Sequence, residues 1–104
     1  MKKRNIILIG MPGAGKSSVG VILAKALGYE FIDTDLVIQH REKRLLREII
    51  ADEGNEGFLA IENEVNATLE ADESVIAPGG SAIYGKEAME HFKEIGTIDR
   101  KSVV

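Results

Sequence analysis

A glycine-rich turn with the pattern G-x-x-x-x-G-K-S, at residues 10–17, is the feature that most constrains the fold of this chain. It follows Ile6–Ile9, a short and wholly apolar run that predicts a strand buried on both faces, as in a parallel sheet. From Ser17 to Leu27 the apolar residues recur at helical spacing, and Gly28 supplies a stop. A strand before such a turn and a helix after it are the context that a phosphate-binding loop requires.

The residues of this turn predict binding of a nucleoside triphosphate. Glycines allow the backbone to approach a phosphate without Cβ collisions, and the following helix adds its positive N-terminal end. Lys16 can reach the β- and γ-phosphates, and the hydroxyl of Ser17 can ligate Mg²⁺. The alternative is a glycine-rich turn that caps an ordinary helix, which requires four fixed positions to match by chance.

Two carboxylates follow the second predicted strand, Tyr29–Ile32. Asp33 and Asp35 flank Thr34, and residues two apart in an extended segment point the same way. Because ligands of open α/β sheets sit beyond the carboxyl ends of the strands, both side chains could face one cleft. One could hold the water shell of magnesium, and the other could accept a proton from a substrate hydroxyl. The alternative for either residue is a helix cap.

The rest of the chain continues the alternation of strands and helices. A helix is expected to start near Leu36. The charged run at residues 40–44 interrupts its apolar pattern, which resumes at Leu45 and continues to Gly54. Gly79-Gly80 after the third strand is either a simple turn or a backbone N–H presented to a ligand at the same sheet edge. The further expected elements are a helix over 56–71, a strand over 75–77, a helix over 86–95 and a strand beginning at 97.

Three other side chains carry no predicted chemistry. His40 lies in a charged run and His91 on a helix, and neither has a metal-ligand partner at suitable spacing, so both are expected at the surface. Phe58 lies on an apolar stripe and is expected in the core.

Composition narrows the class of protein. The 104 residues are 44% hydrophobic and contain no cysteine, which supports one core and excludes disulfides and thiolate metal sites. Residues 1–50 hold nine basic and five acidic side chains, whereas residues 51–104 hold four basic and twelve acidic. The acidic second half argues against a nucleic-acid partner, and the absence of a long apolar run argues against a membrane. We therefore expect a cytoplasmic protein.

The last residues do not fit a buried strand. Asp99, Arg100 and Lys101 follow at once after Ile98, and three consecutive charges are foreign to a central parallel strand. We expect an incomplete domain over residues 1–98 and an atypical tail over residues 99–104. The Ile6–Ile9 strand is then expected to lack a neighbour on one side.

The chain resembles the shikimate kinases. The resemblance rests on GMPGAGKSSVG at 10–20, LGYEFIDTD at 27–35, Gly54 with Phe58 and Glu62, and the Gly79-Gly80 turn, and it covers nearly all of residues 4–98. It implies a P-loop α/β/α fold of the nucleoside monophosphate kinase type, with a parallel sheet ordered 2-3-1-4-5. It also implies transfer of the γ-phosphate of ATP to shikimate, in the pathway of aromatic amino acid biosynthesis.

The resemblance assigns roles residue by residue. Asp35 would bind and help activate substrate hydroxyls, with Lys16 as the second catalytic residue. Ser17 would hold Mg²⁺ and Asp33 would support it, while Gly79 and Gly80 would contact the substrate. The residues implied for the phosphates of ATP are Gly10, Gly13, Ala14, Gly15, Lys16, Ser17 and Ser18.

Three positions depart from the family pattern. Leu59 stands where the family has an arginine that grips the shikimate carboxylate, Ser81 replaces a third glycine, and Pro78 replaces a threonine. The family also continues for about 70 residues through an arginine-bearing lid, which the resemblance implies is missing here.

Three hypotheses remain open at this stage. The first is a shikimate kinase-like enzyme that uses ATP and Mg²⁺, acts on a hydroxylated small molecule and is a monomer at full length. The second is a related sugar-acid or polyol kinase, and the third is a fragment that binds nucleotide without turnover.

Overall fold

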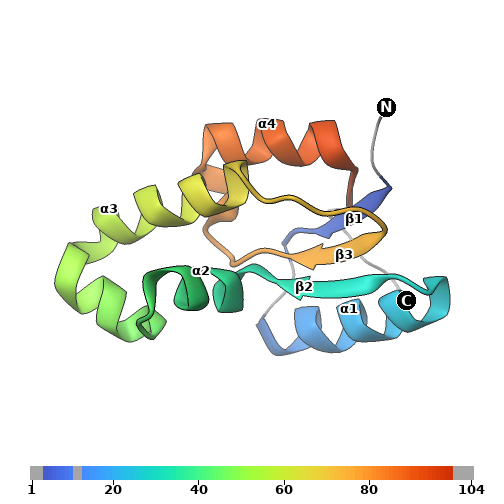
Figure 1. The fold of residues 1–104 in the computed structure, drawn as a ribbon, viewed down its shortest axis with the longest axis horizontal. Coiled ribbons are helices and arrows are strands. Elements are labelled where there is room, and N and C mark those ends of the chain that lie inside the picture. Colours follow the sequence, from blue (N-terminus) through green and yellow to red (C-terminus); the bar gives the residue numbers. More distant parts are fainter. Residues whose placement is uncertain (1–3, 11–12, 100–104) are drawn as a thin grey trace.

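The computed structural model describes residues 4–10 and 13–99, and for residues 13–17 it describes the backbone only. These residues form one parallel sheet with helices on both faces (Figure 1). The elements in chain order are β1 (Asn5–Leu8), α1 (Gly13–Leu27), β2 (Glu30–Asp33), α2 (Thr34–Glu42), α3 (Leu46–Ala67), β3 (Ser74–Ala77), a 3₁₀ helix η1 (Ala82–Tyr84), α4 (Lys86–Ile95) and β4 (Thr97–Asp99).

The strands lie in the order β2-β3-β1-β4, and every neighbouring pair is parallel. This confirms the α/β fold and the first four positions of the order that the resemblance implied. Parallel neighbours require crossover connections, which α1 and the longer α2–α3 segment supply between successive strands.

The expectation that β1 lacks a neighbour is wrong. Ile7 pairs with Ile98, and Leu8 pairs with Asp99, whose carbonyl accepts a hydrogen bond from the N–H of Ile9 (2.9 Å). Asp99 is tolerated because β4 is the last strand of the described sheet, and its side chain is only partly buried. Residues 100–104 of the expected tail lie outside the described part.

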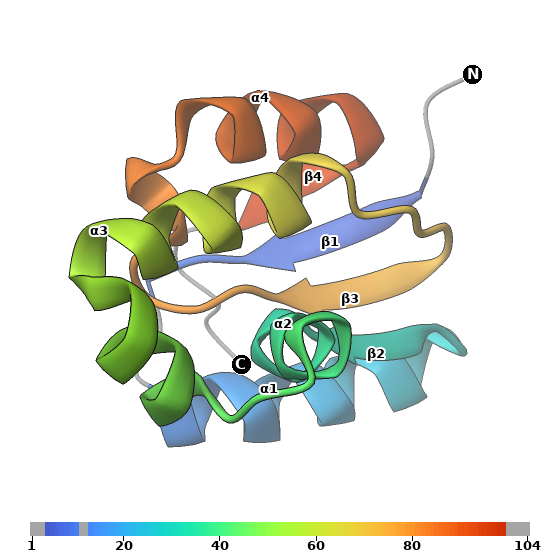
Figure 2. The ribbon, with the colours of Figure 1, turned by 60° about the vertical axis from the view of Figure 1, so that its left-hand side comes forward.

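Two clusters of apolar side chains cover the two faces of the sheet. On one face, Ile7 and Ile76 pack with Phe92 of α4. On the other, Leu8 and Val75 pack with Ala24 of α1. Adjacent residues of β1 thus enter opposite layers, as strand geometry requires. Figure 2 shows α4 on one side of the sheet and α1 on the other.

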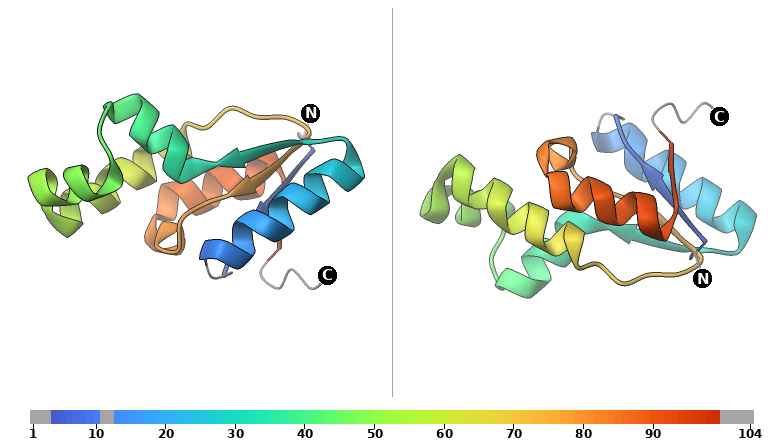
Figure 3. Two further views of the ribbon diagram at one scale, coloured as in Figure 1. Left: turned by 90° about the horizontal axis from the view of Figure 1, so that it is seen from below. Right: turned by 90° about the horizontal axis from the view of Figure 1, so that it is seen from above.

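The α2–α3 corner projects from one end of the sheet (Figure 3) and has a core of its own. Ile38, Ile49 and Val65 are buried there, and Phe58 packs against them as expected. The two helices predicted on either side of Gly54 form one element with a bend at that glycine, which has φ 75° and ψ 173°. A positive φ is accessible to glycine without the Cβ clash that other residues incur.

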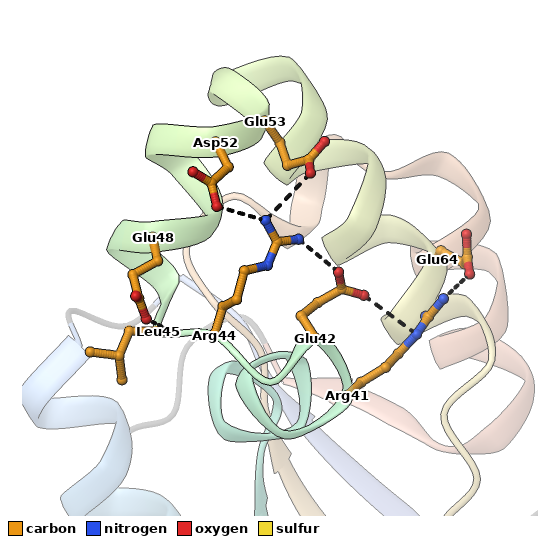
Figure 4. A network of polar contacts seen from close by, with 8 residues as sticks. All are labelled: Arg41, Glu42, Arg44, Leu45, Glu48, Asp52, Glu53 and Glu64. Atoms are coloured by element: carbon orange, nitrogen blue, oxygen red, sulfur yellow. Dashed lines mark hydrogen bonds and ion pairs between the residues drawn. The ribbon is translucent and has the colours of Figure 1, made fainter.

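Ion pairs connect α2, the turn after it and α3 in this corner. Several of the carboxylates involved belong to the acidic second half of the sequence. Arg44 contacts Glu42 (3.0 Å), Asp52 (3.1 Å) and Glu53 (3.4 Å), while Arg41 contacts Glu64 (Figure 4). The hydrogen bonds that Arg44 donates to Glu42 and Asp52 raise its pKa above the usual range. The charge asymmetry along the sequence therefore reflects pairing across the α2–α3 turn as well as solvent exposure.

Candidate functional site

The candidate site lies at the carboxyl edge of the sheet. Because β1, β2 and β3 are parallel, the segments that follow Leu8, Asp33 and Ala77 leave the sheet at the same edge. These segments are the glycine-rich turn, the Asp33–Asp35 segment and the loop that begins at Pro78.

The start of the glycine-rich turn is suited to an anion. Gly10 has φ 85°, which glycine adopts readily, and α1 begins at Gly13 with no acidic residue in its first turn. The backbone N–H groups and the helix dipole at such an end favour a phosphate. The predicted roles of Gly13, Ala14, Gly15, Lys16 and Ser17 depend on side chains or loop contacts that lie outside the described part, whereas Ser18 is described and exposed.

Asp33 is the N-cap of α2. Its Oδ1 accepts a hydrogen bond from the backbone N–H of Asp35 (2.9 Å), with the extended backbone typical of that position. The capping alternative therefore holds for Asp33. The carboxylate is only partly buried, so a role in supporting a metal remains a prediction.

Asp35 and Gly79 lie against each other at the sheet edge. A Cβ placed on Gly79 would lie 2.9 Å from Oδ1 of Asp35 and 2.9 Å from Oε2 of Glu62. Both distances are closer than real Cβ contacts allow, so a glycine is required for the three groups to meet in this way. The predicted pair of Asp35 and the double glycine is thus brought together, although the two lie more than 40 residues apart in the sequence.

Gly80 occupies a different environment from Gly79. It is exposed, and a Cβ placed on it would meet nothing within 4 Å. The N–H of Ala82 donates to the carbonyl of Gly79 (3.0 Å), so the two glycines begin a closed turn. The simple-turn interpretation is correct for the backbone, and contact with a ligand at Gly80 remains a prediction.

Glu62 was not among the predicted site residues, yet it lies at the centre of this cluster. It is 2% exposed, and its Oε1 accepts a hydrogen bond from the hydroxyl of Ser81 (2.6 Å). The sequence did carry a signal: Glu62 lies four residues after Phe58 and three before Val65, on the stripe of α3 that otherwise holds apolar side chains. A carboxyl group on a buried helix face is costly unless it has a hydrogen-bond or ion-pair partner.

A cavity of about 300 Å³ lies next to this cluster, between α3 and the segment from Ser81 into α4. Its wall contains Glu62 and Ser81 but not Asp35, and it also contains Leu59, which is 37% exposed. Leu59 brings an apolar surface to the wall and has no hydrogen-bonding group.

The two histidines differ in their exposure. His40 is exposed as expected, whereas His91 is partly buried and its Nε2 lies 2.6 Å from the carbonyl oxygen of Leu69. Among residues 4–10 and 13–99, no group of three or more His, Asp or Glu side chains could hold a metal ion. None of the described helices is long and apolar enough to cross a membrane.

A comparison with protein families supplies the deciding observation. The family model described as Shikimate kinase matches residues 12–100. The chain belongs to the shikimate kinase family. Members of this family use ATP and Mg²⁺, and a glycine with positive φ at position 10, shortly before α1, is compatible with the phosphates of that nucleotide.

Curated relatives in this family share about four residues in ten with the chain. Shikimate kinase 2 of Yersinia enterocolitica is 38% identical over 95 residues, which cover 91% of this chain and 55% of the relative. Shikimate kinase of Symbiobacterium thermophilum is 42% identical over 95 residues, with 90% and 55% covered. The chain therefore spans about half the length of the curated relatives that it matches.

Solved shikimate kinases share the fold. The enzyme of Acinetobacter baumannii, solved in complex with shikimate, superposes with a TM-score of 0.84 at 37% identity, and the match covers 92% of this chain and 54% of that one. The enzyme of Aquifex aeolicus superposes with a TM-score of 0.79 at 36% identity, with 90% and 60% covered.

Proposed function

We propose that the protein to which these residues belong transfers the γ-phosphate of ATP to a hydroxyl group of shikimate or a close analogue. The observation that carries the proposal is the contact of Asp35 with Gly79 at the carboxyl edge, beside the segment that leads into the glycine-rich turn. A carboxylate and an exposed backbone turn are thereby placed where a parallel α/β sheet binds ligands.

Each residue group then has a distinct task. The turn from Gly10 and the N-terminus of α1 bind the phosphates, and Lys16 is the proposed cation for the transferred group. Ser17 and Asp33 are the proposed holders of Mg²⁺, which neutralises phosphate charge when bound. Asp35 orients the acceptor hydroxyl and accepts its proton, while Gly79 and Gly80 present the loop that limits the acceptor's position.

Binding of ATP is tested first, by titrating the nucleotide calorimetrically into the protein with Mg²⁺. Lys16→Ala removes the cation that contacts the phosphates, so we expect a loss of measurable affinity. Asp35→Asn keeps the shape of the side chain but removes the base, so nucleotide affinity should persist while acceptor-dependent ADP release falls at least 100-fold. Unchanged ATP affinity in Lys16→Ala would refute the phosphate-loop assignment.

The wall of the cavity favours a second candidate acceptor. Leu59 cannot form the paired, charge-assisted hydrogen bonds that an arginine makes with a carboxylate. A neutral polyol loses nothing at such a wall, whereas loss of the contact weakens an acidic acceptor by about 2–4 kcal/mol. We therefore propose assays with shikimate, sugar acids and neutral polyols side by side.

Leu59→Arg separates these two acceptor classes. If the acceptor is shikimate, the arginine should lower its KM about tenfold or more and leave the KM of ATP unchanged. If the acceptor is a neutral polyol, the same substitution should leave or raise its KM. Leu45→Arg, which adds the same charge at another exposed leucine, is the matched control.

Nucleotide binding without turnover is the alternative to both enzymes. It predicts tight binding of ADP and no acceptor-dependent release of ADP with any compound in the panel. Within the kinase proposal we also include a cytoplasmic location, a monomeric state at full length, and a kinase domain over residues 1–98 followed by an atypical tail.

A further inference from the structure

A buried carboxylate of α3 is joined to the loop after β3 by a hydrogen bond. The hydroxyl of Ser81 donates to Oε1 of Glu62 over 2.6 Å. Glu62 is 2% exposed and Ser81 is partly buried, so the bond is partly shielded from water.

The second oxygen of the same carboxylate lies against the other end of the loop. Oε2 of Glu62 would lie 2.9 Å from a Cβ on Gly79, and Oδ1 of Asp35 would lie at the same distance from that Cβ. Glu62 therefore contacts both Gly79 and Ser81, and Gly79 lies between the carboxylate of Glu62 and that of Asp35.

The loop is a closed turn, so its four residues hold a fixed arrangement among themselves. The N–H of Ala82 donates to the carbonyl of Gly79, and Ser81 has φ −89° and ψ 1°, the values of the third residue of a type I turn. Gly80 at the tip has open space around it. The hydrogen bond from Ser81 to Glu62 attaches this turn to α3, beside the buried Ala82.

We propose that Ser81 and Glu62 are positioning residues: their hydrogen bond fixes the turn Gly79–Ala82 relative to Asp35 and thereby sets the affinity for the acceptor. Neither side chain needs to touch the acceptor for this effect. The attachment itself follows from the contacts above, whereas its consequence for the acceptor rests on the proposed function.

Amide hydrogen exchange tests the attachment without any ligand. The N–H groups of Ala82 and Tyr84 are hydrogen-bonded to the turn and report its opening, whereas the N–H of Met89 bonds within the first turn of α4 and serves as a reference. In Ser81→Ala we expect exchange at the two reporters to accelerate about tenfold or more relative to Met89. Ser81→Thr keeps the hydroxyl and should restore slow exchange.

A matched control removes a hydroxyl elsewhere. Thr97→Ala changes an exposed side chain of β4 and should leave the reporters unchanged. An equal acceleration at all three amides in Ser81→Ala would show a general loss of stability and overturn the proposal, as would unchanged exchange at Ala82 and Tyr84.

Steady-state kinetics of the same variants, measured in the full-length protein, test the consequence for the acceptor. Ser81→Ala should raise the acceptor KM about tenfold, leave the KM of ATP unchanged and alter kcat less, and Ser81→Thr should reverse the change. An unchanged acceptor KM would refute the consequence for binding. If the unmodified protein shows no acceptor-dependent turnover, the proposed function fails, and the exchange experiment still decides whether Ser81 and Glu62 hold the turn.

Discussion

The side chain of Asn63, near the C-terminal end of α3, accepts a hydrogen bond from the backbone N–H of Ala88 in the first turn of α4, over 3.0 Å. Its amide group also donates to Oε1 of Glu87 over 2.9 Å. The residue at the N-cap position of α4 is Gly85, which has no side chain to perform this function. The helix is therefore capped by a residue from another helix, which ties α3 to α4 beside the proposed acceptor site.

Replacement of Asn63 by alanine should lower the free energy of unfolding by about 1–2 kcal/mol, because α4 loses its side-chain cap. Denaturation in urea, followed by circular dichroism, measures this change. Asn55→Ala, at an exposed position of α3, is the matched control and should stay within about 0.5 kcal/mol. Equal effects of the two substitutions would contradict the capping role.

Glu87 should make stability depend on pH in the acid range. The hydrogen bond from Asn63 holds the pKa of the Glu87 carboxyl below its usual range. Its contribution to stability is therefore present above the pKa in the unfolded chain, about 4.3, and is lost as pH falls through the lower pKa of the folded protein.

The variant Glu87→Gln tests this dependence, because glutamine keeps an oxygen for Asn63 but cannot ionise. The unmodified protein should be the more stable of the two at neutral pH, and the difference should vanish in strong acid. Glu90→Gln, on the same helix and exposed, is the control. A difference that stays constant from neutral to acid pH would exclude the ionised carboxylate as its source.

Replacement of Asn66 by an apolar residue should stabilise the protein. It is fully buried, and within the described residues neither its Oδ1 nor its Nδ2 has a hydrogen-bond partner. Burial of an unsatisfied amide costs about 1–3 kcal/mol, so Asn66→Leu should raise the free energy of unfolding by about 1–2 kcal/mol after some loss to the larger volume. Thermal unfolding measures this change, with Asn55→Leu as the control. A lower unfolding temperature in Asn66→Leu would mean that the Asn66 amide forms hydrogen bonds in the folded protein.

Replacement by alanine should lower stability at Gly79 but not at Gly80. Gly79→Ala forces its methyl group against the carboxylates of Asp35 and Glu62, so we expect a loss of about 1–2 kcal/mol in stability together with weaker acceptor binding. Gly80→Ala meets open space and should leave stability within about 0.5 kcal/mol.

Acceptor kinetics complete this comparison. Gly80→Ala narrows the space beside the tip of the turn and should raise the acceptor KM without altering the urea midpoint. An unchanged acceptor KM in that variant would remove Gly80 from the proposed binding site, and an unchanged midpoint in Gly79→Ala would contradict the packing of Gly79 between the carboxylates.

Strong local signals made most of the elements predictable. The helix expected over 86–95 is α4 itself, and the second strand differs from its expected range by one residue at each end. The η1 helix was not expected, because Ala82–Tyr84 carries no periodic pattern in so short a span. The prediction that β1 lacks a neighbour on one side was wrong. The parallel crossover that leads to β4 places this strand beside β1, whatever the charges that follow Ile98.

The sequence by itself predicted the glycine-rich turn between a strand and a helix, the parallel α/β layers and the two aspartates where β2 ends and α2 begins, because each depends on residue types within a few positions of one another. Tertiary structure decided how Asp35, Glu62, Gly79 and Ser81 meet. Their contacts join segments separated along the chain by many residues, and they form only when α3 packs beside the sheet edge. Local periodicity reports which face of a helix is buried, but it does not report which side chain of a distant loop that face will meet.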